Sequence, residues 1–119
     1  MSELPDISMG ISKPELFEKF KLQLNKDFEN CGLSGEFSIN LIPDYNFIAE
    51  VLTCEVEKIN KSSSGKLNEL LYRIDISEAQ IKKAFNLNPD ISLNEIIAGL
   101  IVKRELQKIV IKEHYKSKG

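Results

Sequence analysis

The residues of this chain that could perform chemistry are carboxylates and arginines, and several of them gather between residues 72 and 78. Asp75 and Glu78 stand three residues apart there, and could act as an acid/base pair or as ligands for Mg²⁺. Acidic side chains beside a helix N-terminus are also stabilised by the helix macrodipole, by up to about 1 kcal/mol. We favour this structural role, and keep Arg73, Asp75, Glu78 and Arg104 as a candidate polar cluster of a small enzyme or an anionic-ligand binder.

Arg104 is assigned to this cluster by its place on the last predicted helix. Ile97 and Ile101 precede it on the same face, so the guanidinium lies at the boundary of the core. A guanidinium there needs a carboxylate, because an unpaired buried charge costs several kcal/mol. We therefore expect Arg104 to pair with Asp75 or Glu78 and to attach the last helix to the segment 72–78. Binding of an anionic ligand by Arg104 is the functional alternative.

Other catalytic chemistry has little support in the sequence. His114 is the single histidine and stands five residues from the end of the chain, which is a poor place for a triad or a zinc site. Cys31 and Cys54 form no CxxC motif, and the six glycines form neither a GxGxxG nor a GxxxxGK[ST] pattern. We expect no metal site and no cofactor, and a protein that is not an enzyme.

The net charge of −2 conceals an asymmetry between the two halves of the chain. Residues 1–60 carry 5 basic and 11 acidic side chains, a charge of −6, whereas residues 61–119 carry 11 basic and 7 acidic ones, a charge of +4. The basic row that contributes to this excess repeats every four residues on the last helix and consists of Arg104, Lys108, Lys112 and Lys116.

This basic interaction face has several interpretations. The simplest is a solvated row of cations, which suit the C-terminal end of a helix. It could also bind an acidic partner protein or the acidic half of a second copy. Weak binding to nucleic-acid phosphates is a further alternative, although a pI near 5.5 argues against a dedicated nucleic-acid binder.

Three serines predict where helices begin. Ser12, Ser77 and Ser92 each stand three residues before a Glu or Gln, which is the capping-box pattern, so helices are expected from residues 13, 78 and 93. The first should end at Gly32, because glycine readily adopts the left-handed conformation after a helix. The third should bring Gly99 into close contact with another helix, because a mid-helix glycine otherwise costs about 1 kcal/mol.

The middle of the chain allows two interpretations. The apolar residues of 45–60 recur with a helical period, and Asp44 is a suitable N-cap. Residues 36–42 alternate as a strand does, so an α+β fold with an antiparallel hairpin over 36–42 and 47–58 is the alternative. Residues 61–65 are expected to form a flexible connector before a short helix at 67–74.

We therefore expect an all-α fold, a compact bundle of about five helices with an extended link near residues 33–43. Residues 1–11 would form an N-terminal arm, residues 12–116 a single domain and residues 117–119 a tail. The longest apolar run, 96–102, is too short to cross a bilayer, and no secretion signal follows the first residue, so the cytoplasm is the expected location.

Two segments resemble small bacterial helical proteins that carry the elements LLYRID and RExQK. They are residues 70–78, LLYRIDISE, and residues 101–108, IVKRELQK. The resemblance covers the C-terminal half and corresponds to no named family. It implies a helical fold and the grouping of Arg73, Asp75 and Arg104, and it implies no activity, substrate or cofactor. The function expected from the sequence is a protein–protein interaction or self-association module.

Overall fold

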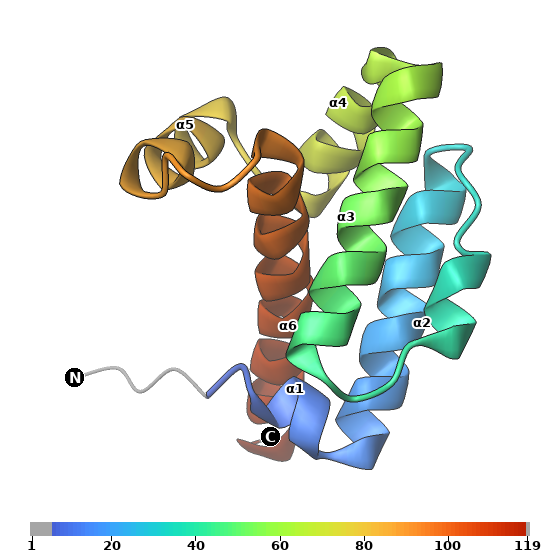
Figure 1. Cartoon of the computed structure of the whole chain (residues 1–119). Helices are drawn as coiled ribbons and strands as arrows, with labels where there is room; N and C mark the ends of the chain where they lie inside the picture. The colour runs from blue at the N-terminus through green and yellow to red at the C-terminus, as the bar shows by residue number, and fades with distance from the viewer. Residues whose placement is uncertain (1–5, 119) are drawn as a thin grey trace.

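The computed structural model describes residues 6–118, except for the side chains of residues 64, 117 and 118. Its elements are α1 (Met9–Ser12), α2 (Pro14–Asn30), the 3₁₀ helix η1 (Glu36–Asn40), α3 (Tyr45–Ser62), α4 (Ser64–Ile74), α5 (Glu78–Leu87) and α6 (Leu93–Lys118). The described residues contain no strand, so the predicted all-α bundle is confirmed and the alternative hairpin over 36–42 and 47–58 is wrong (Figure 1).

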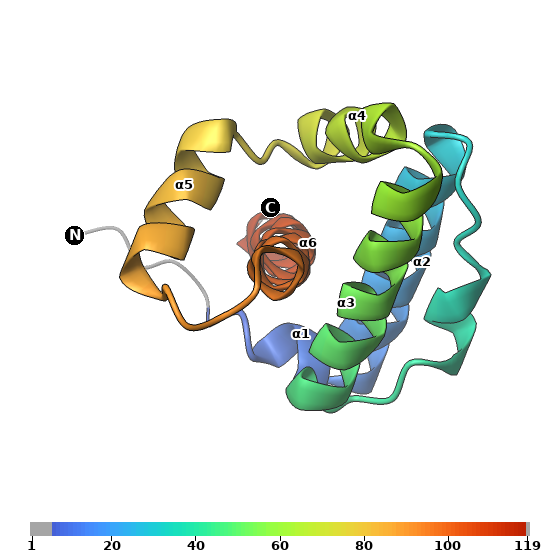
Figure 2. The ribbon, with the colours of Figure 1, turned by 45° about the horizontal axis from the view of Figure 1, so that its top comes forward.

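Helix α6 lies at the centre of the bundle. Figure 2 looks along α6 and shows the other helices arranged around it, and α1 to α5 each pack against it. Its residues are consequently buried on several faces, from Ile97 and Ala98 to Leu106 and Val110. A helix surrounded in this way does not need a single apolar face. The sequence predicted one buried face for this helix, and the structure buries residues on more than one of its faces.

The apolar faces of α2 and α3 form much of the core, and the face of α3 is the one that its helical period predicts. In α2, Phe20, Leu24 and Phe28 are at most 1% exposed, and each such side chain contributes roughly 1.5–3 kcal/mol through burial. In α3, Ile48 and Leu52 are fully buried. Periodic burial therefore outweighs the β-propensity of the valine, threonine and phenylalanine residues in α3.

The predicted helix starts are confirmed to different degrees. At α5 the capping box is complete, because the Gln80 N–H donates to Ser77 Oγ at 3.2 Å and the Ser77 N–H donates to Gln80 Oε1 at 2.8 Å. At α6 the Glu95 N–H donates to Ser92 Oγ at 3.2 Å. Asp44 caps α3 by accepting from the Phe47 N–H at 3.3 Å, as its position predicts.

The capping box predicted at Ser12 is wrong. Ser12 is the last residue of α1. Helix α2 begins at Pro14, and Lys13, at its N-cap position, provides no side-chain cap. Proline at the first helical position has no N–H that needs a partner, and its φ already suits the helix. The helix therefore begins at the proline, two residues beyond the serine.

Two helices end with a residue in the left-handed conformation. After α2, Gly32 has a φ of +75°, and the Leu33 N–H donates to the Phe28 carbonyl at 2.9 Å, as predicted for a glycine stop. After α4 the same arrangement is built on Asp75, with a φ of 75° and a bond from the Ile76 N–H to the Leu71 carbonyl at 2.9 Å.

The segments expected to be irregular are more ordered than predicted. The link near 33–43 contains η1, in which the Ser38 hydroxyl donates to the Gly35 carbonyl at 2.8 Å, so the alternating pattern belongs to a 3₁₀ helix. The connector expected at 61–65 shrinks to Ser63 between α3 and α4. A single extended residue is sufficient to redirect the chain there.

Both ends of the expected domain also differ from the prediction. Residues 9–12 of the expected arm form α1, where an added Cβ on Gly10 would lie 2.7 Å from Leu106 Cδ2, so α1 is packed closely on α6. Helix α6 continues to Lys118 and includes most of the expected tail. Residues 1–5 and 119 lie outside the described residues.

The close helix contact predicted at Gly99 is wrong. Among the described residues, an added Cβ there would meet no heavy atom within 4 Å apart from its own stretch of α6, whereas its neighbour Ala98 is fully buried. Ala98, and not Gly99, faces the interior at this point of α6, because a helix turns by about 100° from one residue to the next.

Candidate functional site

Arg104 holds the N-terminal half of α6 against the end of α4. Its Nη2 lies 3.4 Å from Asp75 Oδ2, its Nε donates to the Ile74 carbonyl at 3.3 Å, and its Nη1 donates to Gln107 Oε1 at 3.4 Å. The Asp75 carboxylate is 82% exposed, so the ion pair lies at the surface and its strength is limited by water. The contact between α4 and α6 depends on the carbonyl bond as well as on the ion pair.

The rest of the candidate polar cluster is not brought together. The Arg73 side chain extends to Asp27 on α2, with Nε 3.1 Å from Oδ1. Glu78 lines a groove on α5, and the described residues include no ion pair between it and Arg73 or Arg104. The four residues proposed from the sequence therefore belong to three separate surroundings.

A group of polar side chains built around two buried carboxyls lies where α2, α4 and α6 meet. Its centre is Asp27, which is 2% exposed. Besides Arg73 from α4, Asp27 accepts from Gln23 Nε2 at 3.2 Å to each oxygen, and Lys108 Nζ from α6 lies 3.4 Å from Oδ2. One carboxylate thus joins three helices. We call this group, with Glu105, the carboxyl cluster.

Glu105 is the least satisfied member of the carboxyl cluster. It is fully buried, and neither carboxyl oxygen takes part in a hydrogen bond among the described residues, although Lys108 Nζ lies 3.5 Å from Oε1. An ionised carboxylate only accepts hydrogen bonds, whereas a protonated one can also donate. A proton on Glu105 would provide a donor for the neighbouring Asp27.

The protonation states of the two acids differ accordingly. Burial and, to a smaller extent, the adjacent Asp27 raise the pKa of Glu105 to about 9, although Lys108 opposes the rise. Burial also acts to raise the pKa of Asp27, but the neighbouring Glu105, the hydrogen bonds from Gln23 and Arg73 and the charge of Lys108 together hold it below its ordinary value. At neutral pH the pair therefore carries one proton, on Glu105.

The sequence contained a signal for the carboxyl cluster that was not recognised. Asp27 follows Leu24 by three residues on the buried face of α2, and Glu105 stands four residues after Ile101 and four before Ile109 on α6. An acid at a core position of a helix needs partners. Assigning a single apolar face to α6 placed Glu105 outside the core and concealed this.

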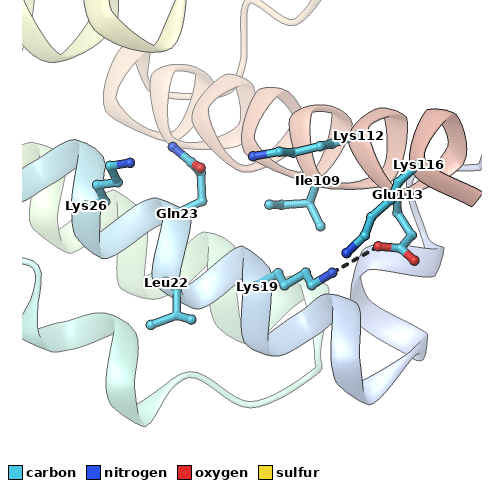
Figure 3. A pocket seen from close by; sticks show the side chains of 8 residues that line it. All are labelled: Lys19, Leu22, Gln23, Lys26, Ile109, Lys112, Glu113 and Lys116. Carbon is cyan, nitrogen blue, oxygen red and sulfur yellow. Dashed lines mark hydrogen bonds and ion pairs between the residues drawn. The ribbon is translucent and has the colours of Figure 1, made fainter. Parts of the chain in front are cut away.

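The open part of the α2–α6 interface is a groove of about 320 Å³ (Figure 3). We call it the lysine groove. Lys19 Nζ lies 3.0 Å from Glu113 Oε1, and this contact holds the pKa of Glu113 below its ordinary value. The residues that line the groove are Lys19, Leu22, Gln23, Lys26, Ile109, Lys112, Glu113 and Lys116.

The basic face predicted on α6 is consequently divided. Arg104 is engaged with α4, and Lys108 is engaged with the carboxyl cluster. Lys112 and Lys116 are exposed and line the lysine groove. The regular spacing of the four basic residues is real, but only the last two are available to a partner.

Helix α5 presents a second surface, which is apolar. Phe85 is 38% exposed, and no residue of α5 is buried. Phe85 and Leu93 line a groove of about 510 Å³. The α5 surface is defined by Ala79, Ile81, Phe85 and Leu93, with Glu78 and Lys82 at the rim of the groove.

Two further properties concern the described residues as a whole. They contain no group of three or more metal-ligating side chains, and none of their helices is both long and apolar enough to cross a bilayer. Comparison of the chain with protein-family models, with curated proteins and with solved structures finds no match.

Proposed function

We propose that this protein is a protein-interaction module that uses the α5 surface to dock a partner protein or a second copy of itself. The observation that carries the proposal is the exposure of large apolar side chains on and beside α5. Contiguous apolar patches with a polar rim mark interaction sites, because soluble monomers rarely leave them open to water. Phe85 and Leu93 form such a patch, and Glu78 and Lys82 border it.

The position of α5 in the fold supports the same proposal. Among the described α-helices it is the one without a buried residue, and it lies apart from α2 and α3 on the other side of α6 (Figure 2). Its 10 residues are too few for a stable isolated helix in water, so packing must stabilise it. A partner on its open side would add to the packing that α6 provides.

A reducing compartment such as the cytoplasm suits this module. Both cysteines are free thiols, and Cys54 is exposed. An exposed thiol persists in a reducing environment and is oxidised or paired elsewhere. We include this location in the proposal.

The proposal is tested by placing charges on the α5 surface. Ala79→Glu with Leu93→Glu, two exposed residues that line the groove, should abolish self-association in size-exclusion chromatography with light scattering, or the adducts formed by a photo-crosslinking residue at position 85 in cells of the source organism. Tyr72→Glu with Tyr115→Glu is the matched control, because these side chains are 88% and 64% exposed and lie outside the α5 surface. A monomer at every concentration that also gives no adduct from position 85 would refute the proposal.

A further inference from the structure

The lysine groove is a second surface and is independent of the α5 surface. It runs between α2 and α6, which are antiparallel, since Lys19 pairs with Glu113 while Asp27 pairs with Lys108. Figure 3 shows the side chains of Lys26, Lys112 and Lys116 extending over the space between the two helices. Both walls of the groove are therefore basic.

The positive charge of the groove is not balanced by the residues that line it. Four lysines and one glutamate line it, which leaves a charge of +3 in a chain whose total is −2. Among residues 6–118, with the side chains noted above excepted, Lys26, Lys112 and Lys116 form no ion pair. Like charges one turn apart on a helix repel each other, so this arrangement weakens the free protein slightly and is relieved by an anionic partner.

The floor of the groove is apolar. Ile109 lies between the helices, and Leu22, at the edge of the groove on α2, is 67% exposed. The carbon stems of the lysines extend this apolar surface, as long basic side chains commonly do. An occupant that matches the groove must therefore carry negative charge on two sides and apolar side chains between them.

We propose that the lysine groove docks an acidic amphipathic helix of a partner protein. An apolar stripe at positions i, i+3, i+4 and i+7 lies against Ile109 and Leu22, and flanking glutamates or aspartates meet the lysines. Lys19 and Lys26 are about 10 Å apart along the axis of α2, which is two helical turns of such a ligand. A compact phosphate group would use the charges and leave the apolar floor uncovered.

The test uses a labelled synthetic helix of about 18 residues with a leucine stripe flanked by glutamates, and measures fluorescence anisotropy at about 50 mM salt. We expect saturable binding that weakens as salt is added, since exposed charge pairs are screened. Lys112→Glu with Lys116→Glu should weaken binding by about tenfold or more. The control is Lys61→Glu with Lys103→Glu, two exposed lysines outside the groove, which should change affinity less than about twofold.

Two other ligands separate the inference from its competitors. A peptide of the same composition in scrambled order keeps the charge and loses the stripe, so it should bind about tenfold more weakly. A single-stranded oligonucleotide of equal charge should also bind more weakly than the helix. Equal binding of the scrambled peptide, tighter binding of the oligonucleotide, or no binding of the helix would each overturn the proposal, whatever the outcome at the α5 surface.

Discussion

The carboxyl cluster and the lysine groove are neighbouring parts of the same α2–α6 interface, and they use basic side chains in opposite ways. In the cluster, Lys108 and Arg73 form ion pairs with Asp27, whose carboxylate is buried. In the groove, Lys112 and Lys116, one and two turns further along α6, have no such carboxylate. The difference shows that a row of regularly spaced cations is not a functional unit until the groups that face each one are known.

The two parts also differ in what holds them together. Removing a partner from a buried ion pair leaves an uncompensated charge, whereas an exposed pair can be replaced by water. The cluster should therefore govern stability and the groove should govern binding. Substitutions in each part test that division.

Asp27→Asn should be the most damaging change. It removes the charge that pairs with both Arg73 and Lys108, and we expect a loss of about 2–4 kcal/mol in the free energy of unfolding, measured by urea denaturation at pH 7. Glu113→Gln is the matched change in the groove, where the pair with Lys19 is exposed to water, and its effect on the free energy of unfolding should be much smaller. Similar losses for the two variants would remove the distinction between cluster and groove.

Glu105→Gln should make stability less dependent on pH. In the native protein Glu105 keeps its proton up to about pH 9, whereas in the unfolded chain it loses the proton near its ordinary pKa of 4.5. Stability from this group is therefore fully present below pH 4.5 and falls as the pH rises towards 9, by at most about 1.4 kcal/mol per pH unit. The glutamine amide donates to Asp27 without a titratable proton, so the variant should be more stable than the native protein at pH 8, by about 1–3 kcal/mol.

Asp27 gives the opposite dependence on the acid side. The pKa of Asp27 is lowered in the folded state, so its contribution to the free energy of unfolding is present above pH 3.8. That contribution is lost as the pH falls through the pKa that Asp27 has in the folded protein. As far as these two acids determine it, maximal stability lies in the mildly acidic range. Urea titrations from pH 3 to pH 9 measure both limbs, and a native protein that gains stability steadily from pH 5 to pH 8 would contradict the assignment of the proton to Glu105.

Lys108→Met and Lys112→Met compare two adjacent members of the basic row directly. Lys108→Met removes a charge that faces Asp27 and Glu105, and should cost about 1–2 kcal/mol. It should also raise the pKa of Glu105 further, because Lys108 is the positive charge that opposes the rise. Lys112→Met should change the free energy of unfolding by less than about 0.5 kcal/mol. Thermal denaturation of the pair at pH 7 is sufficient to compare them.

The features that were predicted correctly depend on residues close together in the chain. The capping box of Ser77, the cap at Asp44 and the stop at Gly32 each involve residues within one or two turns. Their physics is complete within the local sequence, so the pattern is sufficient. The all-α fold follows from such local signals together with the apolar periodicity of the helices.

The carboxyl cluster was not predicted because its members are distant in sequence. Lys108 and Asp27 are 81 residues apart, and only the packing of α6 against α2 and α4 gives either acid its partners. The pair of Arg104 with Asp75 could be predicted because local patterns placed both residues: Arg104 at the core boundary of the last helix, and Asp75 at a junction between two helices. The contacts of a central helix such as α6 cannot be predicted in this way, because residues on several of its faces contact different neighbouring helices.

Gly99→Ala tests, near the start of α6, whether a position of this helix faces a neighbouring helix or open space. The sequence suggested that Gly99 permits close contact with a helix, in which case an added methyl group would cause a clash. The structure leaves the space around its Cβ position open to 4 Å, so alanine should fit and, by restricting the unfolded chain, should stabilise the protein by about 0.5–1 kcal/mol. Gly10→Ala is the contrasting variant, because its Cβ would lie 2.7 Å from Leu106 Cδ2 and should cost about 1–3 kcal/mol. Thermal denaturation measures both variants, and stabilisation by Gly99→Ala with destabilisation by Gly10→Ala would agree with close packing of α1 on α6 and open space beside Gly99. A loss of stability in both variants would mean that Gly99 is closely packed against another helix.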